Sequence, residues 1–300
     1  MNIHHKPDFV CIGPEKTGTT WLHRQMSTHP QIFLPRFKEI RYFIEGSHVP
    51  VGSFRKRVSS NHWHHQELNL YQQRRWDFYR DHWRKLPSMM KEIGWDFRFL
   101  FLPRTDTWYA RLFRADQVSG DITPLYYLLS EEEIARIRTT FPQMKVLIIL
   151  RDPIQRVWSK AKMNLSRHKG QAYEQIVEEK MYHFFDYIFQ RDGCYLSFLT
   201  RWSTHFDQEH LFITFYDKLQ EDPLAFINEI YAFLGVEELS SDAVGDHFYR
   251  KVNAELKVQI PPKYESYLFR LYKACIVALE KKFPTYPQQW LERYAHYGDE

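Results

Sequence analysis

The chain has 300 residues, of which 44% are hydrophobic and 26% are charged, so its composition is that of a globular protein and excludes a disordered one. The formal net charge of +4 suits an anionic small ligand, whereas the short basic runs 55–57 and 74–75 fall short of the dense Lys/Arg stripe of a nucleic-acid binder. The sequence has no apolar run of about 18 residues and no apolar signal-peptide core, so we expect no membrane span and a cytoplasmic protein, although an anchor outside this sequence is left open.

The three cysteines are Cys11, Cys194 and Cys275, and they lie far apart in the chain. Because their number is odd and no CxxC pair occurs, we expect neither a disulfide framework nor a redox motif. Cys11 lies in an apolar run and is predicted to be a buried thiol. This cysteine usage favours a reduced, intracellular setting.

The first elements predicted from the sequence are a buried strand, a loop and a helix. The apolar run 9–12 predicts the strand, residues 13–20 form the loop, and apolar residues at helical spacing from Trp21 predict a helix that ends near Pro30. A strand, a glycine-containing loop and a helix in this order are typical of phosphate-binding α/β proteins.

The rest of the chain alternates predicted helices with predicted strands. The strands are expected at 145–150 and 211–215, and the helices at 131–140, 153–166, 171–190, 195–205, 223–234 and 263–282, with irregular helices and loops over 44–120. Such alternation predicts an α/β fold with a central parallel β-sheet flanked by helices. We expect one domain over 1–300, in which 44–120 is an insertion that shapes the acceptor site.

The loop 13–20 carries the features of a phosphate site. Backbone N–H groups at the start of a helix favour an anion, and Gly13 and Gly18 allow the backbone to approach it closely. Lys16 supplies the full positive charge of the loop. Hydroxyl donors are offered by Thr17, Thr19 and Thr20.

The spacing of Gly13 and Gly18 matches the Walker A pattern, but Thr19 stands where that pattern has its lysine. This difference argues against an ordinary ATP or GTP hydrolase. A P-loop small-molecule or nucleotide kinase remains as the alternative, and it would require Mg²⁺.

A second phosphate site is predicted after the strand 145–150. Arg151 ends this strand, and Ser159 follows eight residues later, within the next predicted helix. Arginine binds phosphate oxygens bidentately and serine adds a donor, so the two side chains suit one phosphate.

The first of these segments resembles the 5′-phosphosulfate loop of sulfotransferases that use PAPS (3′-phosphoadenosine 5′-phosphosulfate). The matching positions are Pro14, Lys16, Thr17, Gly18, Thr19, Thr20, Trp21 and Leu22. The resemblance implies a P-loop-like fold and implies that residues 16–21 bind the donor.

The second segment resembles the 3′-phosphate signature of the same family, with Arg151 and Ser159 at the matching positions. Residues 248–252 resemble the late F-x-R-K-G segment of cytosolic members, which implies that Arg250 and Lys251 contact the 3′-phosphate. Val252 replaces the glycine of that segment.

Residues 38–43 resemble the K-E-x-x-[FY]-F segment of carbohydrate and bacterial sulfotransferases, in which the glutamate is the general base. The resemblance implies that Glu39 is the base and that Lys38 is a helper. Lys16 would stabilise charge on the transferred group and on the leaving phosphate. Some relatives carry histidine at the position of Arg41.

Residues 120–126 resemble a G-E-x-[ST]-P-x-Y segment that lines the site in this group. The implied reaction moves a sulfuryl group from PAPS to a hydroxyl or amine of a carbohydrate or small-molecule natural product, releases PAP and needs no metal. The histidines at 62, 64 and 65 lack a distant fourth ligand and do not predict a metal site. A catalytically inactive PAP-sensing module is a further alternative, and neither the acceptor nor the oligomeric state is set by the sequence.

Overall fold

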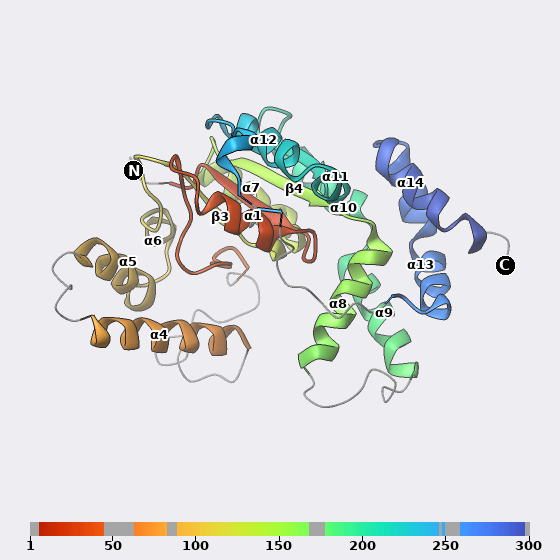
Figure 1. The fold of residues 1–300 in the computed structure, drawn as a ribbon, viewed down its shortest axis with the longest axis horizontal. Coiled ribbons are helices and arrows are strands. Elements are labelled where there is room, and N and C mark those ends of the chain that lie inside the picture. Colours follow the sequence, from red (N-terminus) through yellow and green to blue (C-terminus); the bar gives the residue numbers. More distant parts are fainter. Residues whose placement is uncertain are drawn as a thin grey trace.

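A computed structural model of the chain describes residues 6–44, 63–82, 89–167, 178–245, 248–249 and 259–297. Figure 1 shows a central sheet with α4 (Trp63–Asp81) and α5 (Met90–Phe101) at one end of the molecule and α13 (Pro262–Glu280) and α14 (Thr285–Arg293) at the other. The predicted α/β class is confirmed.

The described strands form one five-stranded parallel sheet in the order β2-β3-β1-β4-β5. Their bounds are β1 (Phe9–Gly13), β2 (Ile32–Phe33), β3 (Val118–Ile122), β4 (Lys145–Leu150) and β5 (Leu211–Phe215). Because all strands run the same way, the loops after β1 and β4, which are neighbours, open at the same edge of the sheet. Ligands of open parallel sheets bind at this carboxyl edge.

The other helices follow the chain around this sheet. They are α1 (Thr19–Met26), α6 (Asp106–Ala110), α7 (Glu131–Thr140), α8 (Pro153–Arg167), α9 (Glu178–Asp192), α10 (Tyr195–His205), α11 (Tyr216–Glu221) and α12 (Pro223–Leu234), with short 3₁₀ turns η2 (Pro124–Leu128), η4 (Ser241–Ala243) and η5 (Ala295–Tyr297).

Helices cover both faces of the sheet, and the strand residues alternate between two cores. Val10 packs in a core with residues of α7, α8, α10 and α13, whereas Phe9 and Cys11 pack in another with α1 and α12. This burial on both faces explains why β1 and β4 are continuous apolar runs. Burial also raises the pKa of the Cys11 thiol to about 12, in keeping with a buried, unreactive cysteine.

Helix ends follow the local signals in the sequence. Ser130 accepts a hydrogen bond from the N–H of Glu133, and the Glu133 carboxylate accepts one from the N–H of Ser130, which is a complete capping box. Helix α12 ends at Gly235, whose left-handed φ of 78° suits glycine.

The sequence did not predict β3, which lies between β2 and β1. Its residues include Gly120, and a Cβ at this position would lie 2.3 Å from the ring of Phe9. Glycine therefore allows β3 to pass close to the Phe9 side chain, but its presence weakens the strand pattern. The sequence also missed α14, and the irregular stretch expected at 44–120 contains the regular helices α4 and α5.

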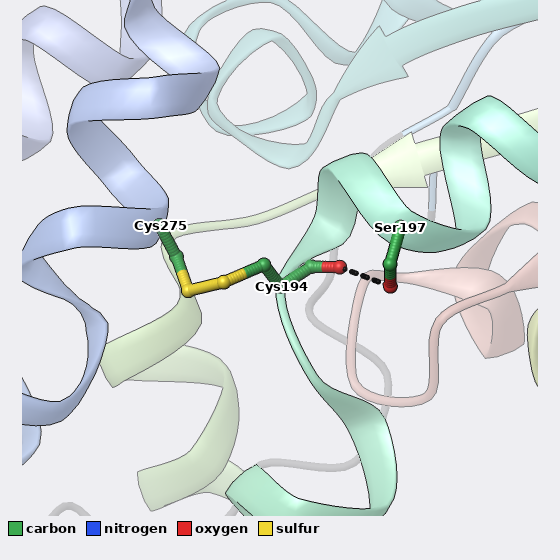
Figure 2. Close-up of a disulfide and its surroundings, with 3 residues drawn as sticks. All are labelled: Cys194, Ser197 and Cys275. Carbon is green, nitrogen blue, oxygen red and sulfur yellow. Dashed lines mark hydrogen bonds between the residues drawn. A yellow bond between two sulfur atoms is a disulfide. The ribbon is translucent and has the colours of Figure 1, made fainter.

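The expectation of no disulfide is wrong. Cys194 and Cys275 form one, with their Cα atoms 5.3 Å apart, although 81 positions separate them in sequence. Figure 2 shows the bond joining α13 to the start of α10, where Ser197 Oγ donates to the carbonyl of Cys194 at 2.8 Å. Sequence spacing could not indicate this pair, because the fold brings α10 and α13 together.

The described residues bear on two possible partners, a membrane and a metal ion. None of the helices there is long and apolar enough to cross a membrane. Nor do the described side chains include a group of three or more His, Cys, Asp or Glu residues placed to hold a metal ion. The side chains of the histidines at 62–65 lie outside the described residues.

Candidate active site

The loop between β1 and α1 is held in a tight conformation by its own residues. Gly13 has φ 96°, and a Cβ there would lie 2.3 Å from the Pro124 carbonyl oxygen. The Thr17 hydroxyl donates to the Pro14 carbonyl at 2.7 Å, so this hydroxyl proton serves the loop itself. Lys16 also has a left-handed φ, of 70°, which is unusual for a residue with a side chain.

Helix α1 begins in a way that leaves backbone donors at the loop. Its N-cap is Gly18, which has no side chain to accept from the first turn, and the first helical bond runs from Leu22 N to Gly18 O at 3.0 Å. The N–H groups of residues 19–21 therefore have no acceptor within the helix. Such a helix start suits a phosphate, and the loop therefore fits the 5′ end of the predicted donor.

Two further contacts tie α1 to other predicted site segments. Lys38 Nζ donates to the Thr20 hydroxyl at 2.9 Å, which brings the residue before Glu39 to the phosphate loop. Trp21 Nε1 donates to the Phe248 carbonyl at 3.0 Å, and the two rings pack edge to face at 5.3 Å. Arg250 and Lys251 follow this contact but lie outside the described residues.

Arg151 links the two predicted phosphate segments directly. It follows β4, the neighbour of β1, and its Nη1 donates to the Lys16 carbonyl at 2.8 Å. Its guanidinium lies 4.5 Å from the centroid of the Tyr216 ring, and the Tyr195 hydroxyl donates to the Arg151 carbonyl at 2.7 Å. The arginine is therefore placed at the loop by contacts from three elements.

Asp152 has a structural task at the start of α8. Its carboxylate accepts from Ile154 N at 2.9 Å, from Tyr294 OH at 2.6 Å and from Arg293 at 2.8 Å. Burial raises the pKa of this carboxyl, while these donors act in the opposite direction. A carboxylate used in this way is a poor match to the metal-binding Asp that a kinase would need. Ser159, two turns further on α8, is buried.

The Glu39 carboxylate lies between two cations. Arg41 Nη2 is 2.6 Å from Glu39 Oε2, and Lys38 Nζ is 3.8 Å from Glu39 Oε1. Glu39 and Arg41 have φ values of 61° and 56°, which are sparsely populated for residues other than glycine. Such backbone persists only when its surroundings hold it.

The segment that follows β3 provides this support. Arg41 N donates to Thr123 Oγ1 at 3.5 Å and Tyr42 N donates to Tyr126 OH at 3.0 Å. The Thr123 and Tyr126 hydroxyls each donate to Asp121 at 2.8 Å, and Tyr109 OH donates to the same carboxylate at 3.2 Å. Burial raises the pKa of Asp121 to about 6 despite these donors.

The strand order arranges these groups along one edge of the sheet. Glu39 lies after β2 and is held by residues that follow β3, Lys16 follows the central β1, and Arg151 follows β4. Glu39, Lys16 and Arg151 thus lie in this order along the edge.

Four side chains that the structure places at or near the site were not predicted from the sequence. Tyr216 directly follows the predicted strand 211–215, and this position at the end of a strand could have indicated that it lies near the site. The other three are the charged residues Glu15, Lys160 and Arg191, which meet behind the loop. Their separation in sequence gives no local signal.

Comparison with known proteins identifies the family. The model of a family described as the sulfotransferase family matches residues 7–241, which is most of the chain. The chain belongs to the sulfotransferase family. This membership favours sulfuryl transfer over the kinase alternative.

Two curated relatives of this sulfotransferase act on heparan sulfate, according to their names. One is the mouse bifunctional heparan sulfate N-deacetylase/N-sulfotransferase 4, which is 25% identical over 77% of this chain and 22% of its own length. The other is the human heparan sulfate glucosamine 3-O-sulfotransferase 6, 25% identical over 47% of this chain and 42% of its own length. The chain therefore spans less than half the length of either relative.

A solved structure supports the fold. The sulfotransferase from Alicyclobacillus acidocaldarius superposes with a TM-score of 0.61 over 92% of this chain and 95% of its own, at 22% identity. The P-loop-like parallel sheet expected from the sequence is thus confirmed at the level of the fold.

Proposed function

We propose that this protein transfers a sulfuryl group from PAPS to a hydroxyl or amine of a carbohydrate or small-molecule acceptor and releases PAP. The observation that carries the proposal is the hydrogen bond from Arg151 to the Lys16 carbonyl. It brings the two segments that resemble the family's 5′- and 3′-phosphate sites into contact. One nucleotide with phosphates at both positions matches such a pair.

The donor would supply the sulfuryl group and a phosphate leaving group. The N–H groups of residues 19–21 and the loop residues Lys16, Thr17, Gly18, Thr19, Thr20 and Trp21 would hold its 5′ end. Arg151 and Ser159 would hold the 3′-phosphate, with Arg250 and Lys251 added by the resemblance. Lys16 would stabilise the negative charge that develops on the leaving oxygen.

Glu39 is the proposed general base. It would accept the proton from the acceptor hydroxyl or amine as that atom bonds to sulfur, so the proton moves to the carboxylate and the leaving phosphate keeps its electron pair. Lys38 bridges this region to the loop through Thr20, at 2.9 Å. Base and loop are therefore connected by one side chain.

The acceptor class is inferred from two sources. The 38–43 segment resembles that of carbohydrate sulfotransferases, and the two curated relatives described above are named for heparan sulfate. We therefore place a carbohydrate first and a small-molecule natural product second. The insertion 44–120, with its many aromatic side chains, is proposed to select between them within a single domain.

The cytoplasmic location expected from the sequence stays a prediction. The Cys194–Cys275 disulfide counts against it, because disulfides persist mainly in oxidising compartments.

Calorimetry with PAP, compared with ATP plus Mg²⁺, tests the proposal. We expect PAP to bind tightly without metal and ATP to bind weakly, followed by turnover of PAPS to PAP with heparan sulfate oligosaccharides as the first acceptor tried. Binding of Mg·ATP without binding of PAP would establish the kinase alternative instead. Binding of PAP without turnover of PAPS on any acceptor would support the sensing module.

A further inference from the structure

Glu15 lies inside the phosphate loop, but its negatively charged side chain cannot serve as a phosphate ligand. Its carboxylate pairs with Lys160 of α8 and with Arg191 of α9, whose Nη2 lies 3.2 Å away. A carboxylate beside a phosphate site would repel the ligand unless cations neutralised it. Here two cations from other helices do so.

The pairing continues into the core behind the loop. Arg191 Nε lies 2.5 Å from Asp192 Oδ1, and Arg156 Nη2 lies 2.8 Å from Asp192 Oδ2. The side chains of Arg156 and Asp192 are 0% and 1% exposed. The loop is therefore attached, through charged groups, to a pair that is fixed in the interior.

Glu15 remains ionised in this environment. Burial acts to raise its pKa, but Lys160 and Arg191 outweigh burial and hold the pKa of the carboxyl below its ordinary value. The Glu15 carboxylate is therefore charged at neutral pH, and replacing it with a neutral side chain would leave the Lys160 ammonium, which is 7% exposed, without this carboxylate.

Glu15 and Lys160 each lie next to a proposed phosphate ligand in the chain. Glu15 directly precedes Lys16, and Lys160 directly follows Ser159. The ion pair therefore joins the residue beside the proposed 5′-phosphosulfate ligand to the residue beside the proposed 3′-phosphate ligand.

We propose that Glu15 and Lys160 are positioning residues that fix the spacing between the two phosphate subsites, an inference that rests on the proposed function. A nucleotide with both phosphates gains most from two subsites when their separation already matches the ligand. Fixing that separation before binding removes an ordering cost from the binding free energy. A nucleotide with only the 5′-phosphate gains nothing from the spacing.

The experiment compares the affinity of PAP with that of AMP, which has the 5′-phosphate alone. The variants are Glu15→Gln and Lys160→Met, with Lys160→Arg as the conservative replacement that keeps the charge. Lys218→Met is the matched control, because Lys218 pairs with Glu229 on the surface at 2.7 Å. Thermal unfolding of each variant shows that it is folded.

We expect the preference for PAP over AMP to fall by about 10- to 100-fold in Glu15→Gln and in Lys160→Met, the range found when residues that orient metal ligands are replaced. AMP affinity should stay within about threefold, and the double variant should lose no more preference than either single one, as expected for two residues that act through one contact. Lys160→Arg and Lys218→Met should retain the preference.

Two results would overturn the inference. Either the preference for PAP is unchanged in both variants, or the affinities for PAP and AMP fall by the same factor, which would indicate general damage to the loop. A wild-type protein without any preference for PAP would instead overturn the proposed function. Since that result appears before any variant is made, the two failures are distinguishable.

Discussion

The Arg41 guanidinium lies 2.6 Å from the Glu39 carboxylate, although both residues belong to a segment whose backbone is left-handed at each of them. Arg41 is nearly buried and Glu39 is partly exposed, so the arginine fixes the carboxylate from the protein side. This ion pair engages Glu39 Oε2 and so orients the carboxylate. The other oxygen, Oε1, faces Lys38, whose Nζ lies 3.8 Å away.

Replacing Glu39 with glutamine should remove the base and leave the donor site intact. We expect kcat to fall by about 10²- to 10⁴-fold, the usual contribution of a general base, with unchanged affinity for PAP. Steady-state turnover of PAPS and calorimetry with PAP measure the two quantities. Glu209→Gln, an exposed glutamate away from the site, serves as the control. Full turnover in Glu39→Gln would assign the proton to another group.

Arg41 should act through Glu39 rather than on the donor. In Arg41→Met we expect kcat to fall while KM for PAPS stays the same, because the carboxylate loses the partner that orients it. Arg41→Lys should recover part of the loss, since a lysine can keep the ion pair but not its geometry. A rise in KM for PAPS without a change in kcat would place Arg41 in donor binding instead.

Lys16 should be needed for the transfer itself. Lys16→Ala should lower kcat by at least about 10²-fold, the loss found when one donor to a developing negative charge is removed. Lys218→Met again provides a surface lysine for comparison. Turnover close to that of the wild type in Lys16→Ala would remove this residue from the mechanism.

Asp121 should make stability depend on pH in a recognisable way. Its folded pKa of about 6 lies above the ordinary aspartate pKa of 3.8, so the folded state binds its proton more tightly than the unfolded state. This contribution is complete below pH 3.8 and is lost as the pH rises through 6. Relative to Asp121→Asn, the wild type should therefore lose about 3 kcal/mol between those limits. Urea unfolding of both proteins from pH 4 to pH 7 measures the difference, and parallel curves would show that Asp121 titrates normally.

The disulfide should stabilise the C-terminal helices against α10. Cys194→Ser should lower the free energy of unfolding by about 2–4 kcal/mol, the typical contribution of a disulfide. Dithiothreitol should lower the unfolding temperature of the wild type and leave that of the variant unchanged. An equal response of both proteins to the reductant would show that the cysteines are not joined in solution.

The sequence predicted the elements whose signals are local. Residues 145–150 form the predicted strand, since an apolar run bounded by Arg151 is unambiguous, and Gly235 ends α12 as its φ requires. β3 could not be predicted, because Gly120 weakens its strand pattern. The reason for this glycine is the Phe9 ring of another strand, which leaves no space for a Cβ. Local sequence patterns therefore predict individual helices and strands, but not the contacts between elements that are distant in the chain.

The same limit applies to the candidate site. Lys16 and Arg151 were predicted from their neighbours in sequence, and the structure joins them through the Lys16 carbonyl. The Glu15–Lys160 pair spans 145 positions and exists only because β1 and β4 are neighbours in the sheet. Charged pairs of this kind have no periodicity or spacing that a sequence could show.

The bond between Cys194 and Cys275 turns the intervening chain into a covalent ring. This ring includes β5, the Tyr216 that lies against Arg151, and the 248–252 segment. A single proteolytic cut anywhere in the ring would leave the molecule in one covalent piece under oxidising conditions and in two after reduction. Gel mobility with and without reductant would therefore report such a cut.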